Sequence, residues 1–332
     1  MRRAWAWALA SVFFFGLCAA AQARQYKVGT VPWVGFAPAH VAEAKGFWKS
    51  QGLDVKVFNF PSVQAAHTAF EQKRIDIDFD MMGTAVSLYQ RGLPVVIIAE
   101  SDWSHGGDKV ILRKGVEPAA LKGKPAGVYL NQAAVTYFLN SYLKQHGLSL
   151  ADLKVVEMET APLAKNFIEG RFNLIVSYDP DALRAEKEGN GVVAATSADY
   201  EGVIPEGMMV LQDVLKDIPR EDLTRYFKGW VEAVKWCHDP ANWKEYMQIL
   251  NTKVLEATTP FSEQDLKGML GAVRIHDART QLARNQDGGG LQLFLDDIRG
   301  FLKANQLLQK DFTTKDLFRN EVLVEVLQGS AP

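Results

Sequence analysis

Short apolar runs alternate with stretches of helical periodicity along most of the chain. Between the runs, apolar positions recur at helical spacing, as in residues 39–48. This alternation predicts an α/β fold in which mainly parallel sheets are flanked by helices. The runs are rich in β-branched and aromatic residues and predict strands at Lys27–Pro32, Val55–Phe60, Ile75–Phe79, Val95–Glu100, Lys109–Arg113, Ala126–Leu130, Val155–Glu159, Leu174–Tyr178, Val192–Thr196 and Gly207–Leu211.

From about Glu221 the pattern becomes helical. Apolar side chains at spacings of three and four residues form one face, and Pro240 ends the segment. We interpret this face as core. Its members are Leu223, Tyr226, Phe227, Trp230, Val231 and Val234.

Residues 1–23 have the pattern of an export signal. Arg2 and Arg3 precede an uncharged apolar stretch, and Ala21-Gln22-Ala23 offers a small-x-small cleavage site. The apolar stretch is short for a bilayer span. We therefore expect cleavage near Ala23 and a periplasmic mature protein.

Composition then narrows the class of protein. The 332 residues contain 37 basic and 39 acidic side chains, without the basic excess of a nucleic-acid-binding protein. Removing residues 1–23 leaves a net charge of −4 and Cys237 as the remaining cysteine. An internal disulfide is then impossible, so stability must come from the core. The length suggests two domains or lobes of roughly 150 residues each.

In open α/β sheets, ligands bind beyond the carboxyl ends of the strands. The loops at these ends carry carboxylates, amides and aromatic side chains, but no Lys or Arg. Because the six histidines lack metal-ligand spacing and no nucleophile–base set is evident, we expect no catalytic residue, cofactor or metal. The candidate ligand-binding residues are Trp33, Phe36, Asp80, Met82, Thr84, Asp102, Trp103, His105, Asp108, Tyr129, Asn131, Gln132, Tyr178 and Asp179.

Several motifs together resemble one protein family. The segment VPWVGFAPAHVA at 31–42 is followed by KGFW at 45–48 and QGLDV at 51–55. This order resembles the opening of periplasmic substrate-binding proteins of the taurine/nitrate/sulfonate type, a family that also includes binders of thiamine-pathway pyrimidines. Further similar segments lie at 70–76, 92–95, 102–108, 121–128 and 167–173.

The resemblance implies a type II periplasmic-binding-protein fold with a ligand cleft between two lobes. The first lobe would combine residues 24–112 with the helical completion 207–332, and residues 113–206 would form the second. The crossings are expected near Leu112–Lys114 and Glu206–Val210. Closure around a small molecule would present the complex to the permease of an ABC transporter. We expect a monomer that does not bind nucleic acid.

Two other functions remain open at this stage. A protein of this fold can serve as the ligand-sensing partner of a membrane signalling receptor, and nothing in the sequence separates that role from transport. The same fold also occurs in an enzyme of thiamine pyrimidine synthesis. Export argues against the enzyme, because that chemistry belongs with cytoplasmic metabolites.

The strand-end loops favour a nitrogenous ligand, cationic or heteroaromatic, over a sulfonate. Relatives that bind anions present hydroxyl groups where this chain has Asn131-Gln132-Ala133-Ala134. An anion would also meet like charge from Asp80, Asp102 and Asp108, whereas aromatic faces and carboxylates suit a flat cation. Alternative structural roles are a turn cap for Asp108, a helix cap for Asp181 and core packing for Trp103.

Overall fold

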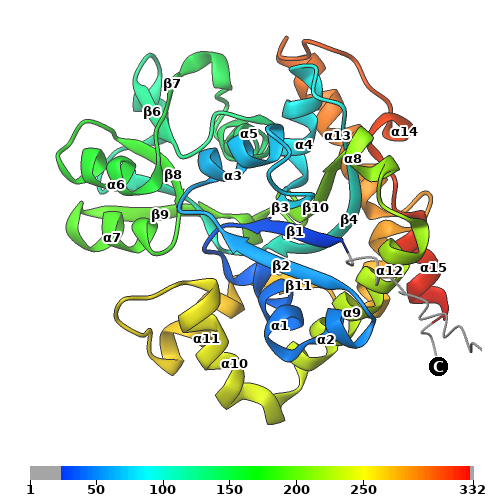
Figure 1. Cartoon of the computed structure of the whole chain (residues 1–332). Helices are drawn as coiled ribbons and strands as arrows, with labels where there is room; N and C mark the ends of the chain where they lie inside the picture. Colours follow the sequence, from blue (N-terminus) through cyan, green and yellow to red (C-terminus); the bar gives the residue numbers. More distant parts are fainter. Residues whose placement is uncertain (1–23, 330–332) are drawn as a thin grey trace, which may run out of the picture.

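A computed structural model describes residues 24–329 as two lobes, each built on its own β-sheet (Figure 1). The predicted export signal lies outside these residues. Two separate clusters of buried apolar side chains form the two cores. The predicted α/β architecture is therefore confirmed, with a sheet and a core for each lobe.

The first sheet has six strands in the order β11-β4-β10-β3-β1-β2. β1 pairs in parallel with β2 and β3, as the alternation of strands and helices along the chain predicts. The strands span Gln25–Thr30 (β1), Asp54–Asn59 (β2), Ile77–Met81 (β3), Val95–Ser104 (β4), Pro205–Leu211 (β10) and Val273–Ile275 (β11).

The second sheet has five strands in the order β7-β6-β8-β5-β9. β6 pairs in parallel with β7 and β8. The strands span Asp108–Arg113 (β5), Pro125–Val128 (β6), Lys154–Glu157 (β7), Leu174–Tyr178 (β8) and Gly191–Thr196 (β9).

Most strands of each sheet run in one direction, but both sheets contain reversed strands. β10 is antiparallel to β3 and β4, β11 is antiparallel to β4, and β5 is antiparallel to β8 and β9. The reversed strands β5 and β10 directly follow the two crossings between lobes, because the chain re-enters a sheet there without an intervening helix. β11 has three residues, and its short apolar pattern did not indicate a strand.

The chain passes between the lobes earlier than the sequence led us to expect. β4 ends at Ser104 and β5 begins at Asp108, so the first crossing is the turn 105–107 and not Leu112–Lys114. The return lies between Thr196 and Pro205, ahead of the expected Glu206–Val210. Two short links therefore connect the lobes, and Ser197 Oγ ties them together by accepting from the Gly106 N–H at 2.8 Å.

Helices flank both sheets (Figure 1). The predicted core helix is α9, whose Trp230 packs against Phe79 of β3 with ring centroids 5.3 Å apart. Within residues 24–329, no helix is long and apolar enough to cross a membrane. The helices are α1 (Ala37–Lys45), α2 (Phe47–Ser50), α3 (Val63–Glu71), α4 (Met82–Gln90), α5 (Ala133–Gln145), α6 (Thr160–Ile168), α7 (Asp181–Glu188), α8 (Gln212–Lys216), α9 (Arg220–His238), α10 (Trp243–Ile249), α11 (Glu263–Gly271), α12 (Ala278–Asn285), α13 (Gly290–Ala304), α14 (Thr314–Leu317) and α15 (Glu321–Gly329).

Candidate functional site

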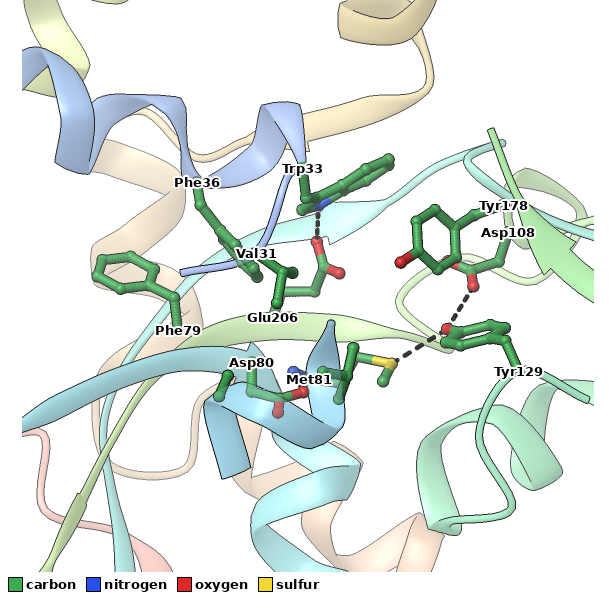
Figure 2. A pocket seen from close by; sticks show the side chains of 12 residues that line it. Val31, Trp33, Phe36, Phe79, Asp80, Met81, Asp108, Tyr129, Tyr178 and Glu206 are labelled. Carbon is green, nitrogen blue, oxygen red and sulfur yellow. Dashed lines mark hydrogen bonds between the residues drawn. The ribbon is translucent and has the colours of Figure 1, made fainter. Parts of the chain in front are cut away.

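A narrow cavity of about 40 Å³ lies between the two lobes (Figure 2). A volume of this size holds about three water molecules, so a ligand must be small or must part the lobes slightly. The walls combine aromatic, aliphatic and carboxylic side chains. They are Val31, Trp33, Phe36, Val63, Ala66, Phe79, Asp80, Met81, Asp108, Tyr129, Tyr178 and Glu206.

The first lobe contributes an indole held by a carboxyl group. Trp33 precedes the short 3₁₀ turn Val34–Phe36, and its Nε1 donates a 2.6 Å hydrogen bond to Glu206 Oε2 (Figure 2). Phe36 packs against Phe79 below, with ring centroids 5.4 Å apart. The indole is thus fixed by β10 at its polar edge.

The second lobe contributes two phenols around Asp108. The Tyr129 hydroxyl donates a 2.6 Å hydrogen bond to Asp108 Oδ1, and the rings of Tyr129 and Tyr178 meet edge to face at 4.9 Å. Tyr178 reaches across the cavity to Trp33, with centroids 6.2 Å apart. Trp33, Tyr129 and Tyr178 therefore form an aromatic wall to which both lobes contribute.

At the base of the cavity, the lining residue Asp80 is paired with a buried histidine behind it. Asp80 at the end of β3 hydrogen bonds with His67 Nε2 of α3, and its Oδ1 accepts from the Met81 N–H at 2.6 Å. Burial alone would lower the pKa of His67, but the Asp80 carboxylate raises it above the usual range. Asp78 lies fully buried on the same face of β3, and burial with the charge of Asp80 raises its pKa well above that of an ordinary aspartate.

The cavity lining lacks positive side chains. None of its twelve residues is Lys, Arg or His, whereas three are Asp or Glu. Burial raises the pKa of Asp108, and burial together with Asp102 raises the pKa of Glu206 well above its usual value. Burial without a basic partner makes the ionised form of these carboxyl groups costly, and a nearby cation or N–H donor would stabilise it.

Six of the candidate residues from the sequence line this cavity: Trp33, Phe36, Asp80, Asp108, Tyr129 and Tyr178. Asp102 lies immediately behind the wall, fully buried opposite Glu206 on the neighbouring strand. Met82 and Thr84 are buried in the first turn of α4 and do not line the cavity.

The remaining candidates lie outside the lining. Trp103 donates to Glu100 Oε1 at 2.7 Å and stacks beneath the Arg284 guanidinium at 4.8 Å, which corresponds to its alternative role in packing. Trp103 and His105 border a separate groove beside α9. Asn131 is exposed, Gln132 precedes α5, and Asp179 is paired with Lys109 at 2.9 Å. These positions follow strand ends in sequence, but their strands or loops point them away from the cavity.

Glu206 was missed by the sequence interpretation. The candidates came from the carboxyl ends of strands, and Glu206 lies near the amino end of β10. Because β10 is antiparallel to β3 and β4, its amino end lies at the same edge of the sheet as their carboxyl ends. Met81 was also missed; its Sδ lies 3.4 Å from the Tyr129 hydroxyl, on the opposite side of the cleft.

Two helix amino ends meet where the lobes touch. The first N–H of α5, from Ala133, donates to Ser87 Oγ of α4 at 3.0 Å. Gly83 lies against the same helix end: a Cβ on Gly83 would come within 2.6 Å of Ala134 N. Helix amino ends attract anions when they are open, and in this arrangement contacts between the lobes occupy them.

One curated relative is the "putative binding protein" YtlA of Bacillus subtilis, which is 27% identical over 214 residues. The match covers 60% of this chain and 62% of YtlA, so the chain spans about three-fifths of the length of that relative.

Solved structures show the same fold. The ligand-binding component of an ABC-type import system from Staphylococcus aureus, solved with zinc bound, has a TM-score of 0.71 at 15% identity, with 91% of this chain and 99% of that chain covered. The periplasmic nitrate-binding protein NrtA from Synechocystis has a TM-score of 0.68 at 17% identity, with coverages of 93% and 89%. The alkanesulfonate-binding protein SsuA of Xanthomonas axonopodis (TM-score 0.69, 14% identity, coverages 90% and 99%) and the desulfurization enzyme DSZB (0.62, 15%, coverages 92% and 99%) share it too.

The sequence model of the NMT1-like family matches residues 19–251, which is more than half of the chain. The expected resemblance and the periplasmic-binding-protein fold are thereby confirmed. The chain belongs to the NMT1-like family.

Proposed function

We propose that this protein is the solute-binding component of an ABC-type importer and closes its two lobes over a small nitrogenous ligand. The observation that carries this proposal is the cavity itself, because side chains of both lobes line it. A ligand that contacts Trp33 and Glu206 on one side and Asp108, Tyr129 and Tyr178 on the other stabilises the closed form selectively. Closure of this kind is the signal that a membrane partner can recognise.

The ligand class follows from the chemistry of the wall. Flat aromatic faces and buried carboxyl groups favour a cationic or heteroaromatic nitrogen compound by stacking, cation–π attraction and N–H···O hydrogen bonds, each contributing about 0.5–2 kcal/mol. Nitrate and alkanesulfonate are ligands of structural neighbours at 17% and 14% identity. The acidic lining supports a different ligand for this chain.

The importer assignment rests on the fold and on its likeness to the ligand-binding component of the ABC-type import system from Staphylococcus aureus. We further propose that residues 1–23 direct export and that the mature protein is periplasmic. It would act as a monomer that docks on a permease. Binding rather than catalysis is proposed, although one neighbour of the same fold is an enzyme.

Native mass spectrometry of freshly purified protein tests the proposal. We expect a co-purified molecule containing basic or heteroaromatic nitrogen that leaves chemically unchanged on mild denaturation. Calorimetry with amines, aminopyrimidines, taurine and nitrate then ranks the classes. Tight binding of taurine or nitrate, without binding of any nitrogen base, would overturn the assigned ligand class; chemical conversion of the bound compound would overturn the binding role.

A further inference from the structure

Two buried carboxyl groups face one another behind the indole of Trp33. Glu206 on β10 is the cross-strand partner of Asp102 on β4. Glu206 is 6% exposed and borders the cavity, whereas Asp102 is fully buried. Side chains directly opposite on antiparallel strands lie on the same face of the sheet, with Cβ atoms about 5 Å apart.

The hydrogen bonds around this pair are one donor short. Asp102 Oδ2 accepts from Ser101 Oγ at 2.7 Å, and Glu206 Oε2 accepts from Trp33 Nε1 at 2.6 Å. Asp102 Oδ1 is buried without a hydrogen-bond partner if both carboxyl groups are ionised. Because cross-strand pairing places Glu206 beside Asp102, a proton on Glu206 would supply the missing donor.

The surrounding charges favour the same arrangement. Glu100, two residues before Asp102 on β4, forms an ion pair with Arg284 at 2.7 Å and contacts His276 Nε2 at 3.0 Å. Across the cavity lies Asp108, whose charge also disfavours ionisation of Glu206. Within residues 24–329, neither Asp102 nor Glu206 forms an ion pair with a basic side chain, so two negative charges at this point would be uncompensated.

We propose that Asp102 and Glu206 share one proton in the empty cavity and that the cationic group of the ligand displaces it at Glu206. This inference rests on the proposed function and deepens it, because it assigns the residue that selects for charge. Glu206 touches the ligand, whereas Asp102 is a positioning residue that keeps the proton on Glu206 while the site is empty. On binding, the N–H donors of the ligand replace the O–H donor, and the proton leaves to solvent.

Proton release makes the affinity depend on pH with a defined sign. The empty site holds a proton that the occupied site lacks, so raising the pH favours binding. Release of one proton increases the association constant about tenfold per pH unit until the pair is ionised in the empty protein. A neutral ligand leaves the proton in place and shows no such slope.

Benzamidinium is a suitable probe because it is flat, remains cationic across the working range and carries paired N–H donors. Calorimetry at several pH values, each in two buffers of different ionisation enthalpy, reports both affinity and proton release. Glu206→Gln keeps the acceptor for Trp33 and the donor for Asp102 but cannot become negative. Asp102→Asn is the matched isosteric change on the other member of the pair, and thermal unfolding verifies that both variants are folded.

We expect wild-type protein to release close to one proton per benzamidinium and to bind more tightly as the pH rises. Glu206→Gln should weaken binding at least tenfold and abolish the release. Asp102→Asn should reach the high-pH affinity of the wild type at a lower pH than the wild type does, because the introduced amide donates to Glu206 and the competing charge of Asp102 is gone.

Binding without proton release in the wild type, or unchanged binding by folded Glu206→Gln, would overturn the shared proton and leave the proposed binding function intact. Failure of benzamidinium to bind at any pH would overturn this inference too. The co-purified molecule seen by mass spectrometry then shows separately whether the binding function stands.

Discussion

Gly83 of α4 lies so close to Ala134 of α5 that a Cβ on Gly83 would be 2.6 Å from the Ala134 nitrogen and 2.7 Å from its Cα. The two residues belong to opposite lobes. Both atoms that the Cβ would meet are backbone atoms, and Ala134 is fully buried. The closed arrangement therefore depends on the missing side chain at position 83.

Gly83→Ala should hinder closure without harming either lobe. The methyl group cannot fit unless the lobes separate, so we expect the ligand to bind about tenfold or more weakly. Small-angle X-ray scattering with saturating co-purified ligand should show a larger radius of gyration than for the wild type. Gly268→Ala on α11 is the control, since nothing lies within 4 Å of a Cβ there; equal compaction of the two variants would contradict the prediction.

Trp33→Phe should weaken ligand binding because it shortens the aromatic wall and removes the hydrogen bond to Glu206. The loss of one hydrogen bond to a buried carboxyl group and part of the stacking surface corresponds to about 1–3 kcal/mol of binding free energy. Titration calorimetry with the co-purified ligand measures it. Trp103→Phe, which alters an indole outside the cavity, should leave affinity unchanged and lower the thermal midpoint instead.

Tyr129→Phe tests the second lobe. Removing the hydroxyl leaves Asp108 Oδ1 buried without its 2.6 Å donor. We expect a loss of about 1–3 kcal/mol in the free energy of unfolding, measured by urea denaturation. Tyr142→Phe, at a buried tyrosine in the core of the same lobe, serves as the comparison. An equal loss of unfolding free energy in both variants would show that the hydrogen bond to Asp108 does not account for the effect.

The Glu100 cluster should make stability decline in acid. Burial alone would raise the pKa of Glu100, but hydrogen bonds and charges from His276 and Arg284 lower this pKa below its usual range. A carboxyl group with a lowered folded-state pKa stabilises the fold above its unfolded pKa, and this stabilisation is lost as the pH falls through the folded value.

Glu100→Gln should remove much of that acid dependence. It leaves Arg284 without its buried counter-charge, so we expect a cost of about 3–5 kcal/mol at neutral pH. Urea denaturation across a pH series measures both the loss of unfolding free energy at neutral pH and its dependence on pH. If Glu100→Gln loses stability in acid as steeply as the wild type, the acid dependence arises from other carboxylates and the prediction is wrong.

The sequence predicted ten of the strands because each is a short run rich in apolar and β-branched residues, as at Leu174–Tyr178. It predicted mainly parallel sheets, but it did not show which strands run in the opposite direction. The direction of a strand depends on how the chain re-enters a sheet after it crosses between the lobes. For this reason β5 and β10 are antiparallel to their neighbours. β11 was not predicted, because the three residues Val-Arg-Ile are too few to establish an alternating pattern.

The site residues that lie near the cavity edge of their strands could be predicted from the sequence. Trp33, Asp80, Asp108 and Tyr178 lie at or just beyond the cavity edge of their strands and line the cavity. Glu206 was not predictable by that rule, since only the antiparallel placement of β10 brings its amino end to this edge. Trp103 satisfied the rule, yet a local hydrogen bond to Glu100 and the stacked Arg284 turn its ring away.

The position of β10 in the first sheet also governs the order in which the molecule can assemble. This strand lies between β3 and β4, yet it is separated from them in the chain by the whole second lobe. The second lobe, whose strands and helices are contiguous in sequence, can collapse from local contacts, while the first sheet lacks a central strand until residues 205–211 arrive. We therefore expect refolding to begin in the second lobe and to end when β10 inserts between β3 and β4 of the first sheet. The ligand cleft, which needs both lobes, would then be the last part of the molecule to form.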